Sequence, residues 1–275
     1  MGNMLFTATG CARCRIVAAF MDDRDIAYEK SDILAEGKER FKTFYKEHRP
    51  EITRGPEGIE FPILFTGDAV IQGLGRILAR LQAEDALDAF VSPAASPPGW
   101  VSGLDLSARH LPDESDLLAV VRFIKENGLK VQLDTNGRNP HVLAALVKEN
   151  LCDKIVFTLH GPAARYKDLT GLPLEESDLV QSLSLISYAA DYNIILPVQP
   201  VTTPQGPGVS ITPEEAAEAA ALVEKATGSK NHPFFIQPLA PAPGSGLDPL
   251  TSPQLFTYRT RCRRFMVRAE IMKTV

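Results

Sequence analysis

Short apolar runs alternate with longer amphipathic segments through the first part of the chain. Apolar runs at 3–7, 26–33, 61–65 and 69–71 predict strands, and segments of helical period accompany them at 12–23, 35–48 and 72–90. A Gly67-Asp68 pair between the last two runs is typical of a hairpin turn. The pattern therefore predicts a unit with the order βαβαββα that ends near residue 91.

A second series of alternating elements begins at residue 100. Its predicted strands are 100–106, 130–134, 154–159, 194–198 and 234–237, and its predicted helices are 114–127, 140–149, 178–191, 212–226 and 253–273. Strands that alternate with helices imply a parallel sheet with right-handed crossovers, open or curved into part of a barrel. The stretch 92–99 is rich in Pro, Ala and Ser and is typical of a semi-rigid linker. The sequence thus predicts an α/β protein with two domains, 1–91 and 100–275.

Composition and charge narrow the class of protein and its partners. With 44% hydrophobic and 23% charged residues in 275, the chain is typical of a soluble globular protein with room for two modest domains. A net charge of -5 leaves no basic face, so we do not expect nucleic acid as a partner. No segment has the pattern of a signal peptide or a membrane span, so we expect a cytoplasmic protein without membrane association. The oligomeric state has no signature in the sequence.

Two of the four cysteines, Cys11 and Cys14, lie at the turn between the first predicted strand and helix. In a reducing compartment such a pair is more often catalytic or metal-binding than structural. At a helix N-terminus the unpaired amides favour a thiolate, and Arg13 and Arg15 would add positive charge. Cys11 would then attack a disulfide, and Cys14, one helical turn on and less exposed, would resolve the mixed disulfide. A half-built metal site and a chance pair are the alternatives.

Three further features accompany the cysteine pair. Ser31-Asp32 lies near the end of the second predicted strand, Phe61-Pro62 opens the third, and Gln72-Gly73 precedes the last helix. Together with the CxxC turn, these features make residues 1–90 resemble a glutaredoxin. The resemblance implies a thioredoxin-like fold for this domain and the activity of a thiol-disulfide oxidoreductase.

The same resemblance implies roles for individual residues. Pro62 would be in the cis form and face the cysteine pair, and Phe61 would supply a backbone contact to the bound thiol. The substrate-binding residues implied in this way are Gly10, Arg13, Phe61, Pro62, Gln72 and Gly73. Glutathione is the implied co-substrate, although the long polar 49–60 loop departs from the family and could alter a glutathione site.

Three phrases of the second domain, at 128–137, 152–157 and 166–171, carry another resemblance. They are similar to phrases, in this order, of the radical S-adenosylmethionine activating enzymes of glycyl-radical systems, which implies a partial (β/α) barrel for 100–275. A ligand pocket would lie at the carboxyl ends of the strands. Its candidate residues are Ser102, Gly103, Asp134, Asn136 and His160. Turn chemistry is the alternative for Asp134 and Asn136, and a structural hydrogen bond is the alternative for His160.

The chain departs from that second family at its cofactor motifs. The family binds a four-iron cluster through CxxxCxxC, and here Thr7 stands where the first cysteine would be. Its Gly-Gly-Glu-Pro phrase corresponds to Gly103-Leu104-Asp105-Leu106, where a leucine adds bulk beside the ligand. Cys152 and Cys262 have no ligand spacing, and Cys152 is expected to be a buried apolar residue. We therefore expect no metal ion, no iron-sulfur cluster and no radical chemistry.

Three functions remain open at this point. The first is a thiol-disulfide oxidoreductase, with Cys11 and Cys14 as catalytic residues, a protein or glutathione as the thiol or disulfide substrate, and a second domain that docks it. The second is an interaction or ligand-binding protein whose CxxC senses its redox state. The third is a radical activating enzyme with an unusual cluster site. The basic residues between Arg259 and Arg268 are expected on the last helix. We expect them to form a solvent-exposed face of that helix; the alternative is that they bind an acidic partner.

Overall fold

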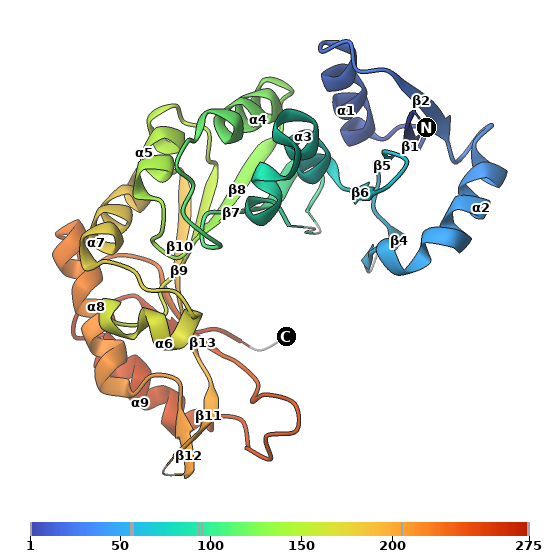
Figure 1. Cartoon of the computed structure of the whole chain (residues 1–275). Coiled ribbons are helices and arrows are strands. Elements are labelled where there is room, and N and C mark those ends of the chain that lie inside the picture. Colours follow the sequence, from blue (N-terminus) through green and yellow to red (C-terminus); the bar gives the residue numbers. More distant parts are fainter. Residues whose placement is uncertain (1, 56–57, 93, 95, 205, 274–275) are drawn as a thin grey trace. The chain divides into compact units, whose positions relative to one another are not determined.

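The computed structural model describes residues 2–55, 58–92, 94, 96–204 and 206–273 (Figure 1). The chain divides into two compact units. The first unit comprises Met1–Ala108 and Pro112–Gln132, and the second comprises Arg109–Leu111 and Leu133–Val275. The division falls within a strand, β8 (Lys130–Thr135).

A four-stranded sheet forms the first part of the first unit. Its strands are β1 (Asn3–Thr7), β2 (Tyr28–Asp32), β5 (Ile63–Phe65) and β6 (Val70–Gln72), in the order β2-β1-β5-β6. β1 is parallel to β2 and antiparallel to β5, and β5 is antiparallel to β6. The accompanying helices are α1 (Ala12–Asp22), α2 (Lys38–His48) and α3 (Leu74–Ala83). The order βαβαββα expected from the apolar runs is confirmed.

Two details of this region differ from the prediction. The polar loop before β5 contains a short 3-10 turn (Arg49–Glu51) and a small hairpin of β3 (Arg54–Gly55) and β4 (Gly58–Ile59). The helix expected to reach residue 90 ends at Ala83, and Glu84–Phe90 is a 3-10 helix. Leu87 and Phe90 are both buried, and because side chains three apart align in a 3-10 helix, this conformation places both in the core.

The first unit continues beyond this sheet through β7 (Trp100–Asp105), α4 (Ser115–Glu126) and the start of β8. Helix α3 packs against both α1 and α4, and Phe20 of α1 meets Phe123 of α4 edge to face with ring centroids 4.9 Å apart. The described residues of the stretch expected to be a linker are held against β7. The Ser92 N–H donates to Gly103 O at 2.8 Å, and Ser96 Oγ accepts from Ser102 N at 2.9 Å. Pro93 and Ala95, which belong to the same expectation, lie outside the described residues.

The second sheet has six strands in the order β14-β13-β10-β9-β8-β7. Its remaining strands are β9 (Lys154–Thr158), β10 (Asp191–Val198), β13 (Phe234–Pro238) and β14 (Ala269–Ile271). The pairs β9-β10, β10-β13 and β13-β14 are parallel, as the alternation of strands and helices predicts. Helices of the second unit are α5 (Pro140–Lys148), α6 (Tyr166–Thr170), α7 (Glu176–Leu185), α8 (Pro213–Thr227) and α9 (Ser252–Cys262). Four of them, α5, α7, α8 and α9, follow one another along one side of the strands (Figure 1).

Some elements of the second unit were not expected. The helix predicted for 253–273 ends at Cys262, and β14 follows as a sixth strand, so the basic positions from Arg259 to Arg268 do not share one helix. Arg259 and Arg263 both pair with Glu270 of β14. A hairpin of β11 (Pro200–Thr203) and β12 (Gly206–Val209) has no apolar alternation that would reveal it. The predicted start of α8 is confirmed, because Thr212 and Glu215 form a capping box around Pro213.

Among the described residues, none of the helices combines the length and the apolar composition that a bilayer span requires.

Candidate functional site

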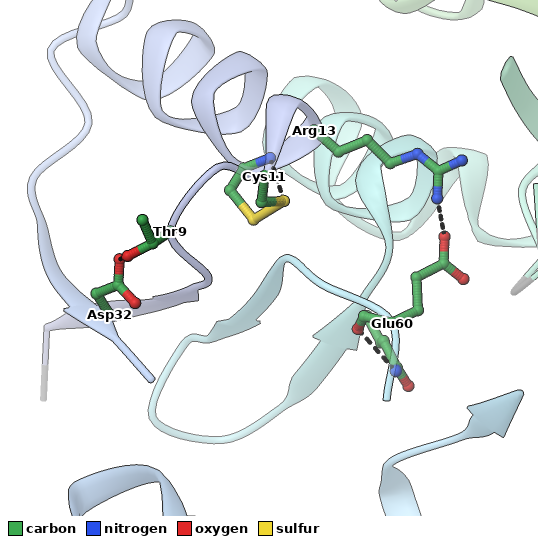
Figure 2. The surroundings of a disulfide bond; sticks show 7 residues. Thr9, Cys11, Arg13, Asp32 and Glu60 are labelled. Atoms are coloured by element: carbon green, nitrogen blue, oxygen red, sulfur yellow. Dashed lines mark hydrogen bonds and ion pairs between the residues drawn. A yellow bond between two sulfur atoms is a disulfide. The ribbon is translucent and has the colours of Figure 1, made fainter. Parts of the chain in front are cut away.

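Cys11 and Cys14 are joined by a disulfide at the start of α1, with their Cα atoms 5.3 Å apart (Figure 2). Cys11 is the N-cap residue of the helix, and its Sγ accepts a hydrogen bond from the Cys14 N–H at 3.1 Å. Cys14 is only 3% exposed, whereas Cys11 is partly exposed. Cys11 is therefore the sulfur that an external thiol or disulfide can reach.

The turn that carries Cys11 is fixed to β2. Gly10 has a φ of +81°, which glycine adopts readily, and the Cys11 N–H donates to Ala8 O at 3.0 Å. Thr9 Oγ1 donates to Asp32 Oδ2 at 2.7 Å, and the Leu34 N–H donates to Asp32 Oδ1 at 2.9 Å. The hydrogen bond from Thr9, followed by that from Leu34, lowers the pKa of the Asp32 carboxyl.

These hydrogen bonds from Thr9 and Leu34 to Asp32 make the stability of the turn depend on pH. Because the pKa of Asp32 is lower in the folded than in the unfolded chain, its contribution to stability is present at neutral pH and is lost as the pH falls through the folded pKa. We expect the Asp32 carboxyl carbon, followed by NMR, to titrate below the ordinary range of an aspartate. Thr9→Ala should raise this pKa toward the ordinary value, because it removes the largest cause of the shift. An unchanged titration in Thr9→Ala would contradict this assignment.

Phe61 and Pro62 are joined by a cis peptide bond, which is the form that the first resemblance implies. Pro62 is buried, and its carbonyl accepts the Gly73 N–H at 3.0 Å. The Phe61 ring is partly buried and lies 5.4 Å, centroid to centroid, from the ring of Phe41. The 61–62 segment is thus tied to Gly73, immediately before α3.

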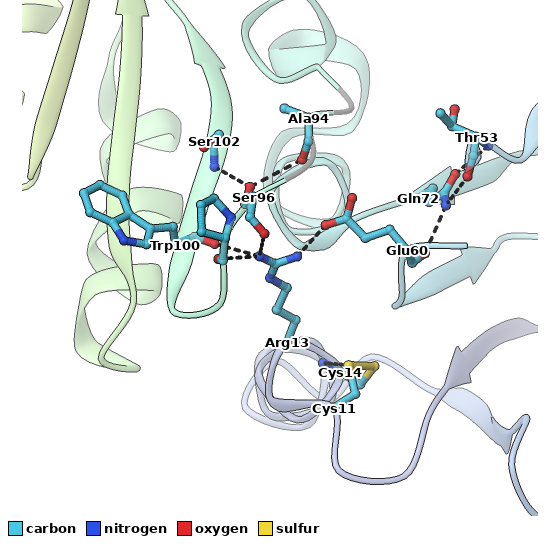
Figure 3. Close-up of polar contacts among 11 residues, drawn as sticks. Cys11, Arg13, Cys14, Thr53, Glu60, Gln72, Ala94, Ser96, Trp100 and Ser102 are labelled. Carbon is cyan, nitrogen blue, oxygen red and sulfur yellow. Dashed lines mark hydrogen bonds and ion pairs between the residues drawn. A yellow bond between two sulfur atoms is a disulfide. The ribbon is translucent and has the colours of Figure 1, made fainter. Parts of the chain in front are cut away.

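The side chain of Gln72 holds the 53–60 loop in place through hydrogen bonds to backbone groups. Its Nε2 donates to Thr53 O at 2.9 Å and to Glu60 O at 3.0 Å, and its Oε1 accepts the Thr53 N–H at 2.8 Å (Figure 3). The side chain is 5% exposed. Every hydrogen bond that its amide makes here holds the loop with the β3-β4 hairpin against β6.

Arg13, expected to add charge beside the sulfurs, points instead away from them (Figures 2 and 3). Its guanidinium pairs with Glu60 Oε1 at 2.6 Å, and Nη2 donates to the carbonyls of Ser96, Pro97 and Trp100 at 2.8, 3.1 and 3.0 Å. The side chain is 18% exposed, and a largely buried cation is stable only where its donors find acceptors. Neither Glu60 nor these carbonyls had a signal in the sequence that marked them as partners of Arg13.

A cavity of about 250 Å³ lies within the first unit, next to Arg13. The candidate residues Arg13, Gln72, Gly73 and Ser102 all line it, whereas Gly10, Phe61, Pro62 and Gly103 do not. Its other lining residues come from the 53–60 loop, the first turn of α3 and the segment from Ser92 to Ser102, and they include Ile59, Leu74, Arg76 and Trp100. The sequence reasoning did not identify Arg76 or Trp100, because nothing in their local pattern distinguishes them from surface and strand positions.

Gly103 has a structural explanation. Its φ is +90°, and a Cβ placed there would lie 2.4 Å from Ser92 O and 3.1 Å from Ala94 Cβ. The missing side chain therefore makes room for the chain's own segment, where the second resemblance suggested a bound cofactor.

The remaining candidates lie in the second unit, where the buried Tyr166 connects two of them. Tyr166 Oη donates to Asn136 O at 3.0 Å and accepts the His160 N–H at 3.4 Å. The His160 ring meets the Tyr166 ring edge to face at 5.7 Å, and burial lowers the pKa of His160. Asn136 is 3% exposed and its Oδ1 accepts the Arg138 N–H at 3.2 Å, while Asp134 is partly exposed. The sequence analysis did not identify Tyr166 as a candidate, because its burial, which requires a partner for its hydroxyl, has no local signal in the sequence.

The described cysteines do not fit a three-thiolate cluster site. Cys152 is 4% exposed, as expected for a buried apolar residue. Cys262 is 0% exposed, its Sγ donates to Ala216 O at 3.5 Å, and burial raises the pKa of its thiol to about 12. Among the described residues, no group of three or more His, Cys, Asp or Glu side chains is placed to hold a metal ion. The expectation that the protein holds no cluster stays a prediction.

Comparison with known proteins gives a limited result. No protein family model and no curated protein matches the chain. Among solved structures, a domain of pyruvate-formate lyase-activating enzyme from Bacteroides vulgatus is similar, with 12% sequence identity and a TM-score of 0.39. The match covers 57% of this chain and 89% of that one.

Proposed function

We propose that the protein is a thiol-disulfide oxidoreductase of glutaredoxin type, in which Cys11 attacks and Cys14 resolves. The observation that carries the proposal is the pair itself, joined at a helix start with Cys11 partly exposed and Cys14 buried. The Cys14 N–H directed at Cys11 Sγ would stabilise a Cys11 thiolate after reduction. The cis peptide before Pro62 and the strand order β2-β1-β5-β6 agree with the thioredoxin-like fold that this function implies.

The proposed reaction has two exchange steps. The Cys11 thiolate attacks one sulfur of a substrate disulfide, so that a mixed disulfide forms and the other substrate half leaves as a thiolate. The Cys14 thiolate then attacks Cys11 Sγ, which releases the second substrate thiolate and forms the Cys11–Cys14 disulfide. The substrate gains two electrons and the dithiol loses them. An external thiol, with glutathione as the first candidate, returns the disulfide to the dithiol.

The second unit has a supporting role in this proposal, which is to dock the substrate at the carboxyl ends of its strands. We propose no nucleic acid and no membrane among the partners, in keeping with the charge of -5. A redox-sensing interaction protein would use the same cysteine pair without turnover.

A radical activating enzyme is the second candidate, since the six-stranded sheet with flanking helices agrees with the partial barrel that this function implies. Its cluster would need a ligand set beyond Cys11 and Cys14, and the two other cysteines are buried in separate parts of the chain. Absorption and iron analysis after anaerobic reconstitution with iron and sulfide would separate the candidates. A bound four-iron cluster would favour the radical enzyme, and colourless protein would favour dithiol chemistry.

Trapping of the mixed disulfide tests the proposed roles of the cysteines. Reduced Cys14→Ala protein, incubated with a small disulfide, should accumulate one adduct on Cys11, because the resolving thiol is absent. Wild-type protein should release the adduct and end with the Cys11–Cys14 disulfide, as mass spectrometry of tryptic peptides would show. Faster adduct formation on Cys14 in Cys11→Ala than on Cys11 in Cys14→Ala would overturn the assignment.

A further inference from the structure

The cavity of about 250 Å³ in the first unit is separate from the cysteine pair, because neither Cys11 nor Cys14 lines it. Four segments form its wall: Arg13 of α1, the 53–60 loop, the first turn of α3 and the stretch from Ser92 to Ser102. All four belong to the same compact unit. The cavity is therefore a feature of the first unit by itself, and the question of what it binds is distinct from the chemistry of the disulfide.

The walls of the cavity are mainly apolar, and Ile59, Leu74, Trp100 and Val101 contribute to them. The volume of about 250 Å³ exceeds the ~150 Å³ of a cavity that holds benzene, and lies below the range of about 300–1,000 Å³ for sites of drug-sized ligands. The cavity therefore suits a molecule with an apolar body somewhat larger than benzene.

Several polar side chains of the wall are already bonded within the protein. Arg13 is bonded to Glu60 and to the carbonyls of the 96–100 segment. Gln72 is bonded to the 53–60 loop, and Ser96 Oγ lies within hydrogen-bonding distance of two backbone groups. A ligand rich in polar groups would find few partners for them, and unpaired polar groups are costly to bury.

The side chain of Arg76 is the exception among these polar groups. It lies in the first turn of α3, lines the cavity and is partly buried. In the part of the chain that the structure describes, its guanidinium makes no hydrogen bond and no ion pair.

The balance of charge in the wall specifies the ligand further. The charged residues that line the cavity are Arg13, Glu60 and Arg76, and the first two form an ion pair. One positive charge, that of Arg76, is left without a counter-charge in the described wall. A guanidinium beside apolar groups favours a carboxylate, which it can bind with two parallel hydrogen bonds. The wall therefore favours a ligand with a single negative charge.

We propose that this cavity is a binding site for a small monocarboxylic acid, whose carboxylate pairs with Arg76 and whose apolar body packs against Leu74 and Trp100. The site is additional to the proposed oxidoreductase function and does not depend on it, since no step of the exchange at Cys11 involves the bound acid. The acid contacts the 53–60 loop, α3 and β7 together, so its binding stabilises the folded first unit.

Trp100 provides the binding assay, because it is the one tryptophan of the chain and lines the cavity. The probes are 3-phenylpropanoate and its neutral amide, each titrated into the full-length protein at neutral pH, with calorimetry as a second readout. We expect the acid to change the Trp100 fluorescence. It should bind at least about tenfold more tightly than the amide, because only the acid can pair with Arg76.

Four variants separate the roles of charge, space and the redox pair. Arg76→Gln should weaken binding of the acid at least about tenfold and leave that of the amide within about twofold. Arg15→Gln removes the same charge from an exposed residue outside the cavity whose side chain has no partner among the described residues, so the affinity for the acid should stay within about twofold. Ser102→Leu fills space at the wall and should weaken both probes at least about tenfold. Cys11→Ser should bind both probes as the wild type does.

Several outcomes would overturn the proposal. They are absence of both a fluorescence change and calorimetric heat with the acid, equal affinity of the wild type for acid and amide, equal weakening by Arg76→Gln and Arg15→Gln, and unchanged binding in Ser102→Leu. Loss of binding in Cys11→Ser with an unchanged melting temperature would overturn the independence from the redox pair. If a variant does not fold, the comparison of acid with amide on the wild-type protein still decides.

Discussion

Replacement of Cys11 by serine is expected to lower disulfide reductase activity by about a thousandfold or more. The hydroxyl of serine is a far weaker nucleophile than a thiolate, and removal of a covalent nucleophile ranks among the largest effects that one substitution has on an enzyme. Cys11 is the partly exposed sulfur of the pair, so no other described thiol can take its place at the start of α1. The activity is measured as the loss of a small disulfide, with an external thiol in excess as the reductant and a sample without protein as the background.

The two buried cysteines provide the matched controls for this experiment. Cys152→Ala and Cys262→Ala remove thiols of the same chain that lie in the interior, so the activity should stay close to that of the wild type. Full activity of Cys11→Ser would show that the pair does not carry the reaction. A loss of activity in Cys152→Ala or Cys262→Ala with an unchanged melting temperature would likewise contradict the assignment.

Gly103→Ala is expected to destabilise the first unit by about 2–5 kcal/mol. The added Cβ would lie 2.4 Å from the Ser92 carbonyl oxygen, so the 92–94 segment or β7 must move, and a φ of +90° is strained for any residue with a side chain. Urea unfolding followed by Trp100 fluorescence measures the change in the free energy of unfolding of this unit.

Gly99→Ala separates the steric clash of an added Cβ from the backbone strain of a positive φ. Gly99 also has a positive φ, +80°, but nothing lies within 4 Å of the position of an added Cβ. We expect a cost of about 1–2 kcal/mol, which is the backbone strain alone. If Gly99→Ala and Gly103→Ala destabilised the protein equally, the close approach of Ser92 would have no energetic weight.

The local features of the candidate site follow from its sequence. A short apolar run before Cys11 and an amphipathic segment after it predict a strand, a turn and a helix, and the structure has β1 and α1 there. Cys11 at the N-cap and Cys14 one turn later are consequences of that boundary, since the helical period alone turns position 14 toward the core. The same reasoning located Pro213 at the start of α8 from its capping residues.

Features that depend on distant parts of the chain could not be predicted in this way. Arg13 looked like a source of charge for its neighbours in sequence, but its acceptors come from residues 60 and 96–100. The stretch 92–99 has the composition of a linker, and composition does not reveal that Ser92 pairs with Gly103. The chain after Cys262 continues a helical pattern of apolar residues, and the edge of the sheet at β13 converts part of it into a strand. In each case a tertiary contact determines the local structure, and the periodicity of a single sequence carries no information about that contact.

The most direct test of the central claim is a turnover measurement on anaerobically purified full-length protein whose iron content is determined on the same sample. The proposed function predicts that iron-free protein, supplied with an external thiol as the reductant, reduces a small disulfide many times per Cys11–Cys14 pair, and that Cys11→Ser abolishes this. Protein that contains about one four-iron cluster per chain and reduces no disulfide would contradict it.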